Sequence, residues 1–194
     1  DREALRDLAE KYFSGWQKGD GACPSSEVAP CAPGVVRREK DTEQLHICLA
    51  YPGVSQGSDN VYAMSIFSSV FGGAMSSRLF QKIREERGMA YSVYTYPSYY
   101  ATVGSLAVYA GTSPENAPEV LKLIRGEADA MIASGITPEE FESTRRQLKG
   151  SYVLGMEGSS PRMNALGRRK LLFGNTQSEE EVVAKIDAVK YEDV

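Results

Sequence analysis

The order of apolar and polar positions along the 194 residues predicts both helices and strands. The first seventeen residues repeat apolar side chains at helical spacing. Between residues 44 and 51 the pattern changes to strict alternation, with Leu45, Ile47 and Leu49 on one face and polar or small residues on the other. This two-residue period is typical of a half-buried strand.

Further strands and a buried helix are predicted around this segment. Val35 and Val36 are expected to begin strand structure. A nearly continuous apolar run after Asp59 predicts a helix that is buried on most sides, with Asp59 as its cap. Residues 91–100 are rich in Tyr, Val and Thr, and residues 103–110 alternate, so two adjacent strands are expected to form a hairpin.

The rest of the chain is predicted to be helical. Helix starts are expected at Ser113, Thr137 and Ser178, and in the last two a Glu three residues on completes a capping box. The helix after Ser113 gathers apolar residues, Ile132 among them, on one face that can pack against a sheet. The pattern therefore predicts an α+β fold, with a mainly antiparallel sheet and helices packed on one face.

Composition divides the chain near residue 34. Residues 1–34 combine the first helix with a linker rich in Pro, Ser, Ala and Gly, and residues 35–194 are expected to form one domain. Asp1 falls inside a helical pattern, and residues 191–194 resemble the opening of another helix. We therefore expect a fragment of a longer protein, with the domain truncated at its C-terminal end.

Charge and cysteine content exclude several classes of function. With 25% charged residues and a net charge of −4, the chain has no basic surface for nucleic acid. No apolar run approaches the roughly 20 residues that span a membrane, and no signal peptide is evident, so a cytoplasmic location is expected. Cys23, Cys31 and Cys48 lack zinc-ribbon spacing and favour a reducing compartment, although a Cys23–Cys31 disulfide stays open.

The residues for metal or nucleophilic catalysis are missing from the sequence. A catalytic zinc takes three protein ligands, and the chain has one histidine, His46, on a predicted strand. We interpret His46 as a structural or surface residue, since a site built from it and the cysteines has no recognised spacing. No serine lies in a GxSxG motif. We therefore predict no catalytic and no metal-binding residue in this chain.

Arg84 and Tyr91 are the candidate binding residues. Arg84 lies near the end of a predicted helix and Tyr91 at the start of the next strand, and a turn around Gly88 can aim both at one point. Taken alone, the two residues are better explained as a helix-terminal cation and an ordinary strand aromatic. Together, an Arg fork and a phenol can donate hydrogen bonds to peptide carbonyl oxygens or to a developing oxyanion.

One long motif carries a family resemblance. Residues 71–93, FGGAMSSRLFQKIREERGMAYSV, closely resemble the signature of the second half of pitrilysin/insulinase-family zinc metallopeptidases, and most of all the bacterial members related to mitochondrial processing peptidase. The strand that ends at Gly53, the helix start at Thr137 and the segment around Arg168 are also similar. Residues 1–34 resemble the last helix of the preceding half and its connection.

The resemblance implies a clamshell of two halves that closes over an extended peptide. In the family, the zinc motif HxxEH lies in the other half, on the same chain or on a partner subunit, so zinc is expected in the parent enzyme and not here. An Arg and a Tyr seven residues apart contact the substrate backbone, and Arg84 and Tyr91 match that spacing. Arg78 is also typical of the family, but we leave it outside the site as a structural residue.

Three other possibilities stay open on the sequence. Relatives in this family include catalytically inactive structural subunits, so the chain is alternatively a scaffold. A plain peptide-binding module that uses an exposed sheet edge is a third interpretation. The isolated fragment can also form a homo-oligomer through apolar surface that the other half would cover.

Overall fold

The computed structural model of the protein describes residues 1–17, 19 and 31–194. Three strands pair into one sheet: β1 (Leu45–Gly53), β2 (Ala90–Tyr99) and β3 (Gly104–Thr112). The α-helices of the described residues are α1 (Arg2–Phe13), α2 (Val61–Ser68), α3 (Ala117–Ser134), α4 (Pro138–Gly155), α5 (Ser159–Phe173) and α6 (Glu179–Ala188). Two π-helical segments, η1 (Ser69–Gly73) and η2 (Phe80–Glu85), and a 3₁₀ turn, η3 (Tyr191–Asp193), complete the set.

The sheet is antiparallel throughout, with the order β1-β3-β2. β3 lies in the middle because β2 and β3 form the predicted hairpin and β1 pairs with the outer side of β3. Val108 of β3 faces Leu49 of β1 and Thr95 of β2 in the register, so these three side chains share one face of the sheet. Because β3 is the central strand, β1 and β2 are the two edge strands of this sheet.

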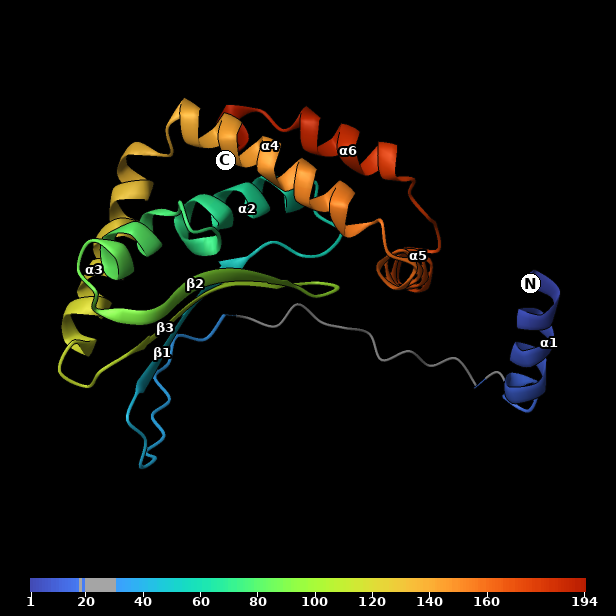
Figure 1. The fold of residues 1–194 in the computed structure, drawn as a ribbon, viewed down its shortest axis with the longest axis horizontal. Coiled ribbons are helices and arrows are strands. Elements are labelled where there is room, and N and C mark those ends of the chain that lie inside the picture. Colours follow the sequence, from blue (N-terminus) through green and yellow to red (C-terminus); the bar gives the residue numbers. More distant parts are fainter. Residues whose placement is uncertain (18, 20–30) are drawn as a thin grey trace.

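All helices that pack on the sheet lie on one of its faces, which confirms the predicted α+β fold (Figure 1). α2, η1 and η2 contact β2, α3 contacts β1 and β3, and α4 and α6 form an outer layer. The core lies between the sheet and this helical layer. The largest fully buried apolar side chains of the domain are Ile66, Phe71, Leu79, Ile83, Val108, Val120, Ile124 and Ile186.

Two local predictions are wrong. Val35 and Val36 lie outside any strand with their side chains almost fully exposed, since no strand or apolar surface of the described residues covers them. Asp59 does not cap α2: the N-cap is Asn60, without a side-chain hydrogen bond. The backbone N–H of Val61 instead donates to the Ser58 carbonyl, so a turn precedes the helix and shifts its start.

The helix starts at Thr137 and Ser178 are confirmed. In both, the hydroxyl accepts from the backbone N–H three residues on, and the Glu at that position accepts from the cap N–H. α3 begins later than predicted, because Ser113 opens a turn in which its hydroxyl accepts from the N–H of Asn116. Ile132 of α3 was predicted to face the sheet, but its side chain is 83% exposed since the buried stripe is narrower.

The first helix stands apart from the sheet (Figure 1). α1 ends at Phe13, and none of its residues is buried, although it carries the apolar stripe that the sequence predicts. The boundary at residue 34 between this helix with its linker and the domain stays a prediction.

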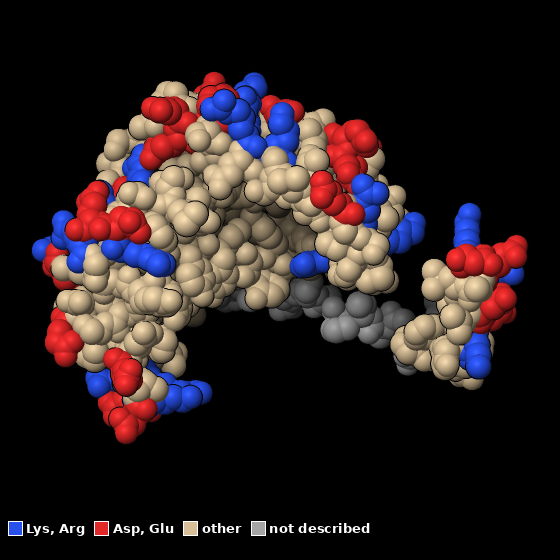
Figure 2. All heavy atoms as spheres, viewed as in Figure 1, with Lys and Arg blue, Asp and Glu red and all other residues tan. Residues whose placement is uncertain are grey.

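No helix among the described residues is long and apolar enough to cross a membrane. Charged side chains in Figure 2 gather over α3, α4 and α6, and the centre of the visible face is uncharged.

Candidate functional site

The candidate site lies beside the free edge of β2, where η1 and η2 pack. Both segments are π-helical, a widened form that is frequent at functional sites. The backbone of η1 approaches β2 so closely that a Cβ at Gly72 would lie 2.7 Å from Cγ2 of Thr95 and 3.1 Å from its backbone N. Only glycine fits this contact. The absence of a side chain at Gly72 therefore sets the distance between η1 and the strand.

A left-handed turn at Gly88 connects η2 to β2. Gly88 has φ +59°, its N–H donates to the Arg84 carbonyl at 3.1 Å, and the N–H of Met89 donates to the Ile83 carbonyl at 2.9 Å. These bonds end the helix in the manner of a glycine C-cap. The chain reverses at once, so Arg84 at the end of η2 faces Tyr91 near the start of β2.

The structure brings the two predicted site residues together. The Arg84 guanidinium carbon lies 5.4 Å from the centre of the Tyr91 ring and 5.0 Å from the centre of the Phe80 ring. Both distances are within the range of a cation–π contact. Phe80 was not predicted, although its place one turn before Arg84 on the same helix is a signal that could have found it. The two rings fix where the guanidinium lies.

The polar atoms of this pair are available to a ligand. Arg84 is exposed and Tyr91 is 74% exposed, and within residues 1–17, 19 and 31–194 neither side chain makes a hydrogen bond or an ion pair. Arg84 also lines a cavity of about 240 Å³. The other residues that line the cavity are Gly72, Gly73, Ala74, Met75, Phe80, Ser92, Val93 and Tyr94. An acceptor in or beside this cavity can reach the five N–H donors of Arg84.

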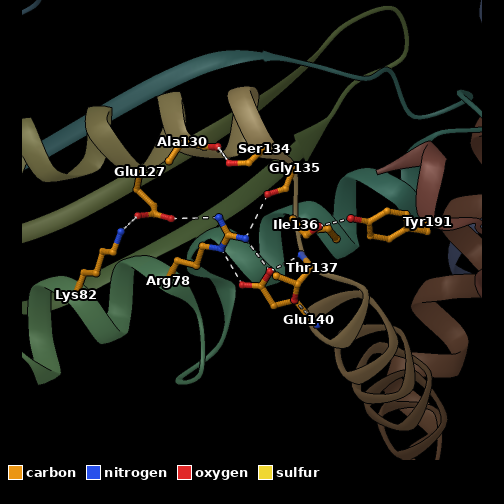
Figure 3. A network of polar contacts seen from close by, with 10 residues as sticks. All are labelled: Arg78, Lys82, Glu127, Ala130, Ser134, Gly135, Ile136, Thr137, Glu140 and Tyr191. Atoms are coloured by element: carbon orange, nitrogen blue, oxygen red, sulfur yellow. Dashed lines mark hydrogen bonds and ion pairs between the residues drawn. The ribbon is translucent and has the colours of Figure 1, made fainter.

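An ionic network holds the opposite side of η2 (Figure 3). Arg78, in the helical residues that lead directly into η2, donates to both carboxylate oxygens of Glu140 at 2.7 Å and to Glu127 at 3.3 Å. It also donates to the Gly135 carbonyl at 3.2 Å. Lys82 of η2 pairs with the other oxygen of Glu127. The network fastens the helix that carries Arg84 to α3 and to the start of α4.

The network shifts the charge equilibrium of its members. The Arg78 guanidinium lowers the pKa of Glu140 to about 2, with the Thr137 N–H adding to the effect. The same ion pair raises the pKa of Arg78. Glu127 is 3% exposed and lies within the apolar stripe of α3. Glu127 was not predicted from the sequence. The one signal that could have found it is an acidic residue at a position of α3 where the helical spacing predicts an apolar side chain.

His46 lies on the opposite face of the sheet from the helices. Its Nδ1 is hydrogen-bonded to the hydroxyl of Tyr109 at 2.7 Å, and its side chain is exposed. In the part of the chain that the structure describes, no three His, Cys, Asp or Glu side chains lie close enough to hold a metal ion. Cys31 and Cys48 are exposed and form no disulfide among the described residues, and Cys23 lies outside those residues.

Comparison with known proteins assigns the chain to a family. The sequence model of the peptidase M16 inactive domain matches residues 1–148, three quarters of the chain. The chain belongs to this family. The resemblance to the second half of pitrilysin-type peptidases is thereby confirmed. The cavity beside Arg84 lies within the matched residues of this M16 inactive domain.

Relatives of this M16 inactive domain carry the name of zinc proteases. An uncharacterized zinc protease of Bacillus subtilis is 35% identical over 185 residues, which cover 95% of the chain and 45% of the relative. One of Streptomyces coelicolor is 38% identical, covering 90% and 40%. The chain therefore spans less than half the length of these relatives. A solved M16 inactive domain from Pseudomonas fluorescens has the same fold, with a TM-score of 0.70 at 22% identity over 78% of this chain and 36% of that one.

Proposed function

We propose that this M16 inactive domain is the substrate-binding half of a zinc-dependent endopeptidase, in which Arg84 and Tyr91 contact the backbone of an extended peptide. The observation that carries the proposal is the exposed guanidinium of Arg84, held against Phe80 and Tyr91 with all its donors available. The family membership and the names of the relatives support the peptidase context.

The chemistry follows from the geometry of the two donors. Stacking on Phe80 and Tyr91 orients the planar guanidinium of Arg84 without occupying any of its N–H groups. The fork can then donate to a peptide carbonyl oxygen, and the Tyr91 hydroxyl can donate a further hydrogen bond. As negative charge grows on a carbonyl oxygen during peptide hydrolysis, each such bond strengthens. One donor of this kind contributes about 2–4 kcal/mol to transition-state stabilisation.

The residues of this chain do not fit a zinc site. The chain has a single histidine, His46, whose Nδ1 is already bonded to Tyr109, and the described residues hold no group of three ligands. In this proposal the metal and the HxxEH motif belong to another half, upstream on the same chain or on a partner subunit. Arg84 and Tyr91 act only on the peptide.

The experiment is a reconstitution. Zinc content and peptide cleavage are measured for this chain alone and then after addition of the upstream half as a separate chain. We expect the chain alone to be inert and free of zinc, and cleavage to appear on mixing. If an upstream half with an intact HxxEH motif and bound zinc forms the complex but no peptide is cut, the proposal fails and a structural subunit is the better interpretation.

A further inference from the structure

A buried carboxylate occupies a position of α3 that an apolar side chain would fill. Glu127 is 3% exposed and continues the buried stripe of Val120, Ile124 and Met131 at helical spacing. Burial of a carboxylate carries a desolvation cost that its ion pairs only roughly offset, and well-packed apolar residues in their place are often as stable. The stability of the core therefore does not explain the charge at Glu127.

Glu127 pairs with two cations of the helical segment that runs into η2 (Figure 3). Arg78 donates to one carboxylate oxygen at 3.3 Å, and Lys82 pairs with the other oxygen. Arg78 is also held by Glu140, so it anchors the start of the segment. A single anchor would leave the segment free to turn. The contact of Lys82, four residues later on the same face, fixes its rotation as well.

Arg84 lies on this same segment, two residues after Lys82 and therefore on a different side of the helix. Ile83, between them, is fully buried in the core. Among the described residues, the Lys82–Glu127 pair is the ion pair that lies nearest to Arg84 in the chain. The rotation that this pair fixes is therefore the rotation that directs Arg84 toward Phe80 and Tyr91.

The π-helical geometry of η2 makes the direction of Arg84 sensitive to that rotation. The N–H of Glu86 donates to the carbonyl of Gln81, five residues earlier, at 2.9 Å. Helical turns of this kind are rare and usually single. Because an α-helical turn holds fewer residues, a return to α-helical bonding would rotate Arg84 about the helix axis and away from the Tyr91 ring.

We propose that Glu127, through Lys82, is a positioning residue for Arg84. Their ion pair holds η2 in the rotation that stacks the guanidinium of Arg84 on Phe80 and Tyr91. This inference rests on the proposed function, since the place of Arg84 matters for cleavage only if Arg84 contacts the peptide. Glu127 lies on α3 and on the far side of η2, so its effect on cleavage passes through Arg84.

The test replaces the ion pair by an apolar pair in the full-length protein. Lys82→Met together with Glu127→Leu removes both charges, and Arg78 keeps Glu140 as its partner. We expect kcat/KM for peptide cleavage to fall about tenfold or more, mostly through kcat, because a donor that acts in the transition state is displaced. Urea denaturation should show no loss of stability, and zinc content should be unchanged.

Two further variants separate positioning from a general effect of the substitutions. Lys82→Arg, which keeps a cation opposite Glu127, should cleave like the wild type. Lys149→Met together with Asp187→Leu is the matched control, since this pair has an N–O distance of 2.8 Å and joins α4 to α6 instead of holding η2. It should also cleave like the wild type.

The decisive comparison repeats the replacement of the Lys82–Glu127 pair in Arg84→Ala. If Glu127 acts through Arg84, the residual kcat/KM of Arg84→Ala changes by less than about twofold. An equal fall in both backgrounds overturns the inference, and so does wild-type cleavage when the pair is replaced in the protein that retains Arg84. Glu127→Gln, which keeps the side-chain size and removes the charge, is compared in the same two backgrounds and decides the question if the double replacement reduces the folded fraction. Failure of the proposed function looks different, because Arg84→Ala would then itself cleave like the wild type.

Discussion

The carboxylate of Glu140 accepts hydrogen bonds from two sources, the Arg78 guanidinium and the backbone N–H of Thr137. Both favour the ionised form, which is why the pKa of this group lies near 2 and not at its ordinary value of 4.5. One residue thus completes the cap of α4 and holds the segment before η2. Protonation of Glu140 weakens both contacts at once.

We predict that the contribution of Glu140 to the stability of the fold is lost in acid. A folded-state pKa below the unfolded value means that Glu140 stabilises the fold above about pH 4.5, and that this contribution is lost as the pH falls toward 2. Glu140→Gln should therefore lower the free energy of unfolding at about pH 6 more than at about pH 3. Urea denaturation of the wild type and the variant at both pH values measures this free energy. Glu139→Gln, at an exposed neighbour, is the control, and an equal loss at both pH values in Glu140→Gln would contradict the prediction.

Single residues of the site differ in how far the sequence predicts them. Arg84 and Tyr91 were predictable because the glycine between them fixes a local turn, so their meeting needs no distant partner. Glu127 was not predictable, because its partners Arg78 and Lys82 lie more than forty residues earlier in the chain. A buried carboxylate is stabilised only by such partners.

Among the elements, the contact between η1 and β2 determines the shape of the cavity. A methyl group at Gly72 would meet the backbone and the methyl of Thr95, both buried. We predict that Gly72→Ala lowers the free energy of unfolding by about 1–3 kcal/mol through overpacking. Gly126→Ala is the matched control: no atom lies within 4 Å of its added Cβ, so α3 should gain about 0.5–1 kcal/mol. Chemical denaturation compares the two, and equal effects would show that the close approach does not matter.

Most elements with local signals were predicted well, although the Asp59 cap was not, and the strand predicted at Val35 did not form. The capping boxes at Thr137 and Ser178 lie within four residues and are confirmed. Val35 and Val36 have strand propensity, but no strand among the described residues pairs with them, and their side chains stay exposed. β1 forms as predicted because its backbone pairs with β3 and one face of its alternating side chains lies against the helical layer.

The molecule as a whole carries features that fit one part of a larger assembly. The chain spans less than half of its curated relatives, and α1 exposes an apolar stripe. Arg84 presents donors without acceptors among the described residues. Each of these is accounted for if a second half and a peptide complete the site, which is the central claim.

The measurement that tests this claim most directly is the kcat/KM and zinc content of Arg84→Ala in the full-length protein. We predict that kcat/KM for peptide cleavage falls about 100-fold to 1,000-fold while zinc content is unchanged, because Arg84 acts on the peptide and not on the metal. Arg87→Ala, at an exposed arginine one turn away that pairs with Glu119 at 3.6 Å, serves as the control and should cleave like the wild type. Wild-type cleavage by Arg84→Ala, or a parallel loss of zinc, would contradict the account.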